Sequence, residues 1–239
     1  MGCNGTTTKE ETIPKQFHEM SENEKEKIRK QMEEQDKDLK EEGRNELPGE
    51  YDRYDWEELM KKLPIQKTDK ERKERLALWN KINEYGNGYV SYKRLTIQLD
   101  RYLELPNVVK NRGPMKLAFK AASNKYAKKG LKIEDNLIEW MEFRIFLVYL
   151  RQYFEYWVMF EAVDKSGDHQ INLDEFKKAL PTMEKWGLKI NNPEEEFKKI
   201  DKNNGGTISF AEFCSYAIEK SLDLETDDGF DDEELKNLK

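Results

Sequence analysis

Apolar side chains recur at helical spacing through most of the chain beyond residue 50. Stripes at this spacing are typical of amphipathic helices that bury one face, so the pattern predicts an all-α fold. The clearest stripes are Trp56, Leu59 and Leu63; Leu76, Trp79 and Ile82; Tyr156, Phe160 and Val163; and Phe176, Ala179 and Leu180. An aromatic band over residues 143–160 is either core or a surface for a partner, with core favoured because aromatic stripes on helices are usually buried.

Residues 1–50 have too few large apolar groups to form a core, so we expect a polar N-terminal arm that is partly helical or disordered. Within it, Ser21 and Glu24 form a capping-box pattern that predicts a solvated helix reaching about Glu42. The apolar stripe of this helix is thin and consists of Ile28, Met32 and Leu39.

Residues 164–175 interrupt the helical pattern with a segment rich in side-chain oxygens. An EF-hand loop wraps calcium with oxygen ligands at positions 1, 3, 5, 7, 9 and 12. The residues at those positions are Asp164, Ser166, Asp168, Gln170 through its carbonyl, Asn172 and Glu175. His169 stands where glycine is expected, at a cost of about 1–2 kcal/mol. We interpret His169 as a surface turn residue, and its strain should weaken calcium binding roughly tenfold.

Residues 201–212 repeat this pattern, with Gly206 at the turn. The ligand positions hold Asp201, Asn203, Thr207, Ser209 and Glu212. Gly205 offers no side-chain oxygen at position 5, so the sequence predicts two Ca²⁺ sites of which the second is weaker. Ile171 and Ile208, both at position 8, should pair across a short β bridge of two residues per strand.

Two further loops retain the outline of an EF-hand without its ligands. In residues 83–94, Tyr85 occupies position 3 and Arg94 places a cation at position 12, which should prevent divalent binding. In residues 131–142, only Glu142 resembles a ligand, because the positions upstream hold Leu131, Ile133 and Asp135. We therefore expect four EF-hand helix-loop-helix units in two pairs, with the first two loops kept for pairing.

These elements divide the chain into four parts. We expect an acylated arm at 1–50, a degenerate EF-hand pair at 51–150, a calcium-binding pair at 151–225 and an acidic tail at 226–239. The window 223–234 also begins with Asp and ends with Glu, but blocks of like charge are usually solvated tails.

Composition and charge limit the classes of function that this chain can have. Charged residues make up 38% and hydrophobic ones 36%, and the net charge of −7 argues against nucleic acid as a partner. Charged residues divide the apolar stretch at 137–163, so no spanning helix is expected, and we also expect no secretory signal. Cys3 and Cys214 suggest no disulfide framework, which fits a reducing, intracellular setting. Neither Cys214 nor His18 has an evident acid/base partner, so we do not expect an enzyme.

The first residues match the N-myristoylation pattern, with Gly2 as the acylated residue. One myristoyl chain binds membranes only marginally, and the arm is not basic enough to help. Cys3 is therefore the candidate second anchor, through palmitoylation, and membrane lipid the expected partner. The alternative is a chance Met-Gly-Cys start in a disordered tail.

From about Asp52 to Asp223 the chain resembles the trypanosomatid flagellar calcium-binding proteins, the calflagins. The resemblance is carried by Trp56-Glu57-Glu58 with Pro64, residues 76–90, Glu142-Phe143-Arg144, Val158-Met159-Phe160 leading into Asp164-Lys165-Ser166-Gly167, and Glu184-Lys185-Trp186-Gly187. It implies four EF-hands of which the last two bind calcium, acylation at Gly2 and Cys3, association with the flagellar membrane and a calcium-acyl switch. The acidic arm, Gly205 and the more degraded first loop depart from the family pattern.

We therefore expect a calcium sensor at the cytoplasmic face of the flagellar or plasma membrane, with a soluble pool and an unidentified protein target. Calcium in the last two loops would reorient helices and make apolar surface or the acyl chain available. The alternative is a calcium buffer, membrane-associated or soluble, that binds the ion without opening. An acylated N-terminus favours the sensor, because a buffer needs no anchor.

Overall fold

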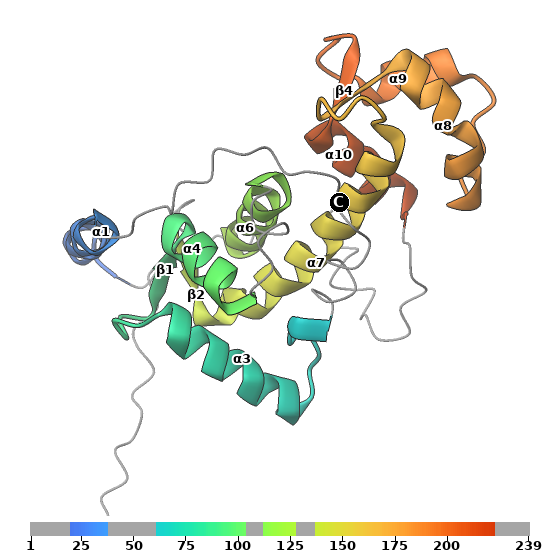
Figure 1. The fold of residues 1–239 in the computed structure, drawn as a ribbon. Helices are drawn as coiled ribbons and strands as arrows, with labels where there is room; N and C mark the ends of the chain where they lie inside the picture. The colour runs from blue at the N-terminus through green and yellow to red at the C-terminus, as the bar shows by residue number, and fades with distance from the viewer. Residues whose placement is uncertain (1–19, 38–60, 104–111, 128–136, 223–239) are drawn as a thin grey trace, which may run out of the picture.

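The computed structural model describes residues 20–37, 61–103, 112–127 and 137–222, and these are mostly helical (Figure 1). The prediction of a mostly helical fold is confirmed. The helices are α1 (Glu22–Lys37), α3 (Asp69–Ile82), α4 (Tyr92–Leu103), α6 (Arg112–Ala127), α7 (Trp140–Val163), α8 (Leu173–Lys185), α9 (Pro193–Ile200) and α10 (Phe210–Lys220). The strands are β1 (Tyr89–Ser91), β2 (Leu137–Glu139), β3 (Gln170–Asn172) and β4 (Thr207–Ser209).

The strands form two antiparallel bridges, β1 with β2 and β3 with β4. Val90 lies opposite Ile138 in the first bridge, and Ile171 lies opposite Ile208 in the second, as expected from their places in the loops. Each strand has three residues rather than the two we expected. All four central side chains are fully buried, so each bridge ties two helix-loop-helix segments to a common core.

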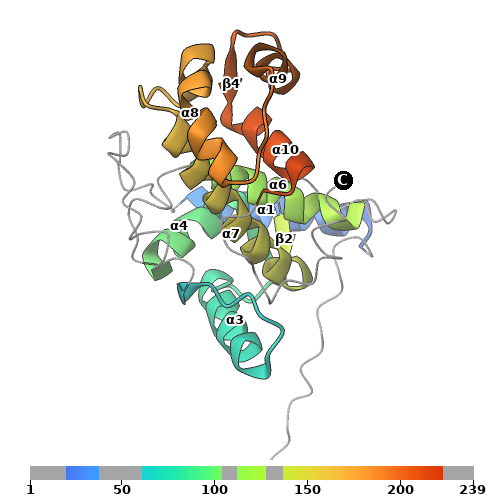
Figure 2. The same cartoon turned by 90° about the vertical axis from the view of Figure 1, so that its right-hand side faces the viewer.

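α7 is the central helix, 24 residues long, and it passes through the predicted boundary at residues 150 and 151. It starts directly after β2, where Glu139 and Glu142 form a capping box, and Asp164 caps its C-terminal end. Figures 1 and 2 show it running from the β1–β2 bridge to the segment that holds α8, α9 and α10. One helix therefore belongs to both halves of the molecule.

The aromatic band on α7 is buried in this conformation. Phe143, Phe146 and Phe160 are fully enclosed, and Phe143 packs against Trp79 of α3 while Phe160 packs against Phe213 of α10. The interpretation of this band as core is therefore confirmed for the described conformation. Among the described residues, no helix combines the length and apolarity needed to cross a bilayer.

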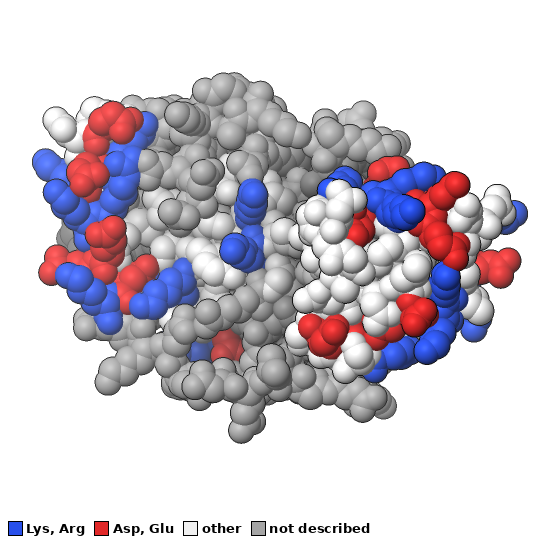
Figure 3. All heavy atoms as spheres, turned by 90° about the horizontal axis from the view of Figure 1, so that it is seen from above, with Lys and Arg blue, Asp and Glu red and all other residues white. Residues whose placement is uncertain are grey.

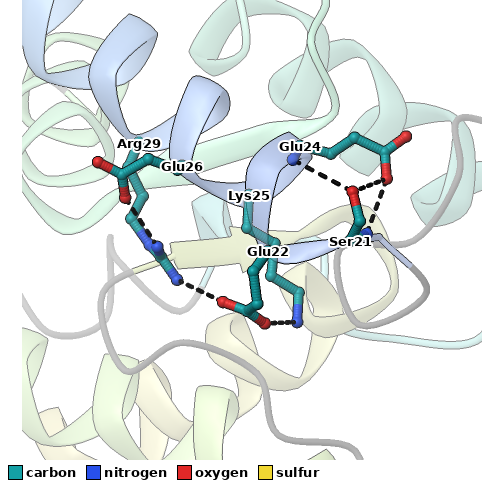
Figure 4. Close-up of polar contacts among 6 residues, drawn as sticks. All are labelled: Ser21, Glu22, Glu24, Lys25, Glu26 and Arg29. Atoms are coloured by element: carbon teal, nitrogen blue, oxygen red, sulfur yellow. Dashed lines mark hydrogen bonds and ion pairs between the residues drawn. The ribbon is translucent and has the colours of Figure 1, made fainter.

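α1 begins with the predicted capping box, in which Ser21 and Glu24 exchange backbone and side-chain hydrogen bonds (Figure 4). The predicted solvated helix is solvated only in part, because Met32 is only 4% exposed and packs with Tyr89 and Leu137. The thin apolar stripe of α1 is enough to hold the helix in place, because the Met32 side chain fills the contact with Tyr89 and Leu137. The predicted extension to Glu42, the start of the folded part at Tyr51, the lipidation residues and the acidic tail all lie outside the described residues.

Candidate metal centre

The third loop folds around the carboxylate of Asp164, the residue that caps the C-terminal end of α7. Its Oδ1 accepts hydrogen bonds from the Gly167 N–H at 2.8 Å and the Ser166 hydroxyl at 3.1 Å. Its Oδ2 accepts the N–H of His169 at 2.8 Å. The first predicted ligand is therefore buried at the centre of the loop, with the other loop residues arranged around it.

Glu175 closes the loop from the other side. Its Oε1 accepts the backbone N–H groups of Lys165 at 3.1 Å and Ser166 at 2.9 Å, and its Oε2 accepts that of Asn172 at 3.0 Å. Burial acts to raise the pKa of Glu175, but the hydrogen bonds from these donors outweigh it and the pKa is lowered. The predicted bidentate ligand is thus held ionised beside the first turn of the loop.

The remaining predicted ligands of the third loop lie at its rim. Asn172 caps α8 by accepting the N–H groups of Asp174 and Glu175, each at 3.0 Å. Asp168 accepts the N–H of Gln170 at 2.9 Å, and both residues are exposed. The side chains of this rim are accessible to an ion arriving from solvent.

His169 has partners that sequence reasoning missed. Its backbone has φ +62, the left-handed conformation expected at this position. Its Nδ1 lies 3.3 Å from Oε1 of Glu161 on α7, and its ring centroid is 5.5 Å from that of Trp157. Burial raises the pKa of Glu161, although His169 opposes the rise. Glu161 precedes Asp164 by three residues and so shares a face of α7 with it, which was the one signal in the sequence.

The fourth loop repeats the arrangement with fewer charges. Asp201 accepts the N–H groups of Gly205 and Gly206, both at 2.9 Å, and Gly206 makes the turn with φ +82. Glu212 accepts the N–H of Asn203 at 3.2 Å and that of Ser209 at 3.0 Å. Burial acts to raise the pKa of Glu212 as well, and hydrogen bonds led by the Ser209 side chain lower it overall.

The two loops are joined by a side-chain hydrogen bond in addition to the strand pairing. The hydroxyl of Thr207 donates to Oε1 of Gln170 at 2.5 Å, and both residues hold position 7 of their loops. With Ile171 opposite Ile208 at position 8, the two loops are joined at two successive positions. The predicted site residues of each loop are therefore brought together, and the two loops are linked.

The chemistry of these donors fits calcium. The loops present carboxylate, hydroxyl, amide and carbonyl oxygens, the ligands of a hard cation, with no thiol or imidazole among the predicted positions. Asp164, Asp168 and Glu175 supply three carboxylates in the third loop, whereas Asp201 and Glu212 supply two in the fourth. The position-7 residues Gln170 and Thr207 would contribute backbone carbonyls.

The two upstream loops lack this chemistry. In the first, the Arg94 guanidinium takes the place of a carboxylate, and Tyr85 is half exposed. In the second, Oε2 of Glu142 accepts the Glu139 N–H at 3.0 Å, and its buried Oε1 has no hydrogen-bond partner among the described residues. Burial raises the pKa of Glu142 to about 8. Leu131, Ile133 and Asp135 lie outside the described residues.

Comparison with known proteins agrees with this geometry. The chain matches the FCaBP EF-hand domain over residues 59–150 and an EF-hand domain pair over residues 156–218. It is 32% identical over 178 residues to a flagellar calcium-binding protein of Trypanosoma cruzi, covering 72% of this chain and 82% of that protein. This chain belongs to the flagellar calcium-binding protein family. The resemblance inferred from the sequence is confirmed.

Other members of the flagellar calcium-binding protein family are equally similar. The proteins TB-1.7G and TB-24 of Trypanosoma brucei brucei are each 33% identical, over 75% and 71% of this chain and 78% of each relative. A solved structure of a homolog of programmed cell death 6 protein from Leishmania major Friedlin aligns with TM-score 0.34 and 17% identity, over 65% of this chain and 76% of that one.

Flagellar calcium-binding proteins are EF-hand proteins and not an enzyme class. Burial also raises the pKa of the Cys214 thiol and so favours its neutral form.

Proposed function

We propose that this member of the flagellar calcium-binding protein family is a calcium sensor with two unequal sites, anchored to membrane by N-terminal acylation and acting as a calcium-acyl switch. The observation that carries the sensor is the linked pair of loops, which are joined by the Ile171–Ile208 pairing. Asp164 and Glu175 hold positions 1 and 12 of the third loop, and Asp201 and Glu212 hold the same positions of the fourth. The upstream loops act as pairing partners in a set of four EF-hands.

The conformational response starts at the carboxylates that close the loops. Bound calcium supplies positive charge that the clustered carboxylates otherwise lack. Glu175 and Glu212 must exchange the N–H donors that they now hold for the ion, and each is the third residue of a helix, α8 and α10. A movement of either carboxylate therefore moves the start of its helix.

α7 gives this movement a route to the rest of the molecule. Asp164 of the third loop caps its C-terminal end, and the buried aromatic band of α7 contacts α3 at one end and α10 at the other. Reorientation of α7 or α10 would uncover apolar side chains such as Phe160 and Phe213, which are the surface we assign to membrane or to an unidentified protein target.

The membrane anchor is supported by the sequence pattern alone. Gly2 and Cys3 have the spacing of a myristoylated and palmitoylated start, and two acyl chains are needed for firm attachment. On the face seen in Figure 3, acidic and basic side chains alternate over α1, so this face of the helix presents no basic patch to assist membrane binding. We assign the protein to the cytoplasmic face of the flagellar or plasma membrane, with a soluble pool.

The decisive experiment is calcium titration by calorimetry on the acylated protein, with liposome co-sedimentation in EGTA and at saturation. Glu175→Gln and Glu212→Gln serve as single-site controls, and Gly2→Ala removes the acyl chain. We expect two unequal sites and a calcium-dependent change in the liposome-bound fraction that Gly2→Ala abolishes.

Calcium binding with an unchanged liposome-bound fraction would instead identify an anchored buffer. The same binding by protein that carries no acyl group in its native cells would identify a soluble buffer. Absence of any calcium-dependent heat in the wild type would contradict both functions.

A further inference from the structure

We propose that the degenerate first loop, residues 83–94, is a docking site for the helix α1 of the same chain, and that Arg94 there supplies the positive charge that calcium supplies in an active loop. The proposal concerns the half of the molecule whose loops we expect not to bind calcium. It does not depend on whether the third and fourth loops bind the ion.

Arg94 is held in an ionic cluster that joins the loop to α1. Its side chain is only 3% exposed, and its Nε lies 3.3 Å from Oδ1 of Asp36, near the end of α1. A second ion pair joins it to Glu84 of the loop itself, and its Nη2 donates to the backbone carbonyl of Gln35 at 3.1 Å. A buried guanidinium needs carboxylate partners, and α1 provides one of the two that Arg94 has among the described residues.

The first loop and α4, the helix that follows it, also supply hydrogen-bond donors to the C-terminal end of α1. Lys93 donates to the backbone carbonyl of Asp36 at 2.7 Å, and the Ser91 hydroxyl donates to the Asp36 carboxylate at 2.5 Å. The last carbonyls of a helix lack partners within it and carry partial negative charge. Cationic side chains from α4 therefore satisfy the end of α1, and this explains why the helix is bound at this end.

An apolar contact extends the interface along α1. Met32 is buried against Tyr89 of β1 and Leu137 of β2, and Ile28 and Met20 are partly buried beside them. α1 thus covers the outer side of the β1–β2 bridge, as seen at the left of Figure 1. The combination of a buried methionine and an acidic residue four positions later is what the loop recognises.

Several charged residues of α1 form ion pairs with one another. Glu22 pairs with Lys25 and Glu26 pairs with Arg29 at 2.9 and 3.0 Å, within the helix itself (Figure 4). The Glu26 side chain is 51% exposed, and an ion pair at such a position contributes little to tertiary structure. Glu26→Gln is therefore a matched control, because it removes a charge from α1 without touching the docking face.

Docking of this kind does not require calcium. An arginine keeps its charge at any accessible pH, so the cluster carries its own cation permanently. The calcium loops lie at the other end of α7 from α1 in Figure 1. α1 is accordingly fixed to the half of the protein that contains the first loop, which we expect not to bind calcium.

Amide hydrogen exchange on the full-length chain tests the proposal, in EGTA and at saturating calcium. We expect amides of residues 28–36 to exchange about tenfold faster in Asp36→Asn and in Arg94→Gln, as expected from a lost ionic contact of ordinary strength. The double variant should exchange no faster than Arg94→Gln alone, because both changes remove the same contact. Glu26→Gln and added calcium should each change these rates by less than about twofold.

Amides of α7 serve as the internal reference for folding. If Arg94→Gln also accelerates exchange in α7, that variant cannot separate loss of docking from general unfolding. Asp36→Asn then separates the two, because Asp36 lies on α1 and outside the main core. The proposal fails if residues 28–36 of the wild type show no protection, if Asp36→Asn leaves their rates unchanged, or if calcium releases α1.

Discussion

The carboxylate of Glu175 accepts the backbone N–H of Ser166 at 2.9 Å, which joins position 12 of the third loop to position 3. The loop is therefore nearly closed by its own hydrogen bonds. The ionised Glu175 carboxylate has already lost part of its hydration. Its contribution to calcium binding is therefore large and is specific to the third loop, which it closes.

Glu175→Gln should weaken the stronger calcium site about 30-fold, because an amide supplies one oxygen and no charge, at a cost of roughly 2 kcal/mol. Calorimetric titration separates the two sites. Glu212→Gln is the counterpart and should affect mainly the weaker site. Equal losses at both sites in either variant would show that the loops cannot be treated as separate ligand sets.

Gly205→Asp should strengthen the fourth site about tenfold by adding the missing oxygen at position 5. A Cβ at Gly205 would lie 2.6 Å from Oδ1 of Asn203, which is the end of a flexible side chain and can move. Gly205→Ala is the control, since it adds the Cβ alone and should not strengthen binding. If the alanine variant binds as tightly as the aspartate variant, the gain comes from a stiffer backbone and not from a ligand.

His169→Gly should tighten the third site by about threefold. Relief of the left-handed backbone is worth about 1–2 kcal/mol. The lost contact with Glu161 involves side chains that are 34% and 23% exposed, so it offsets only part of that gain. His169→Ala keeps the strain and loses the ring, and titration should show weaker binding than in the wild type. If the glycine and alanine variants bind calcium with equal affinity, the change in affinity comes from loss of the ring contacts and not from backbone strain.

Glu142→Gln should change how stability depends on pH. Burial holds the pKa of Glu142 at about 8 in the folded chain, against an ordinary value of 4.5. The folded state therefore binds the extra proton between these values, so the contribution of Glu142 is fully present below about pH 4.5 and is lost as the pH rises toward 8.

Urea unfolding in EGTA measures this effect. The stability of Glu142→Gln relative to the wild type should rise by roughly 3 kcal/mol between about pH 5 and pH 8, at 1.36 kcal/mol per pKa unit. Glu184→Gln, at an exposed glutamate outside both calcium loops, should show no such trend. A constant difference between Glu142→Gln and the wild type would mean that water reaches Glu142 and keeps it ionised.

The sequence specified the parts of this structure that depend on local spacing. The oxygen positions of the two calcium loops, the Ile171–Ile208 pairing and the capping box at Ser21 all follow from residues within a few positions of a motif. Fixed loop geometry turns such spacing into contacts.

Contacts between distant segments could not be predicted in the same way. The position of Arg94 in its loop shows that it is incompatible with calcium, but nothing in the sequence spacing identifies Asp36 as its partner. The burial of Met32 was missed for the same reason, because a single methionine on a polar helix does not reveal the surface that receives it. The contact of His169 with Glu161 required the helix and the loop to be placed together.

The continuity of α7 determines how the protein can be divided into fragments. A C-terminal fragment that starts at Arg151 would begin in the middle of a helix, with its first N–H groups unpaired and Phe154 and Trp157 in a fraying turn. One that starts at Leu137 keeps the capping box of Glu139 and Glu142 and the whole helix, but exposes Phe143 and Phe146, which α3 and its neighbours otherwise cover. Recombinant halves of this protein should therefore be insoluble or poorly folded whichever side of α7 is cut, and calcium affinities are best measured on the intact chain.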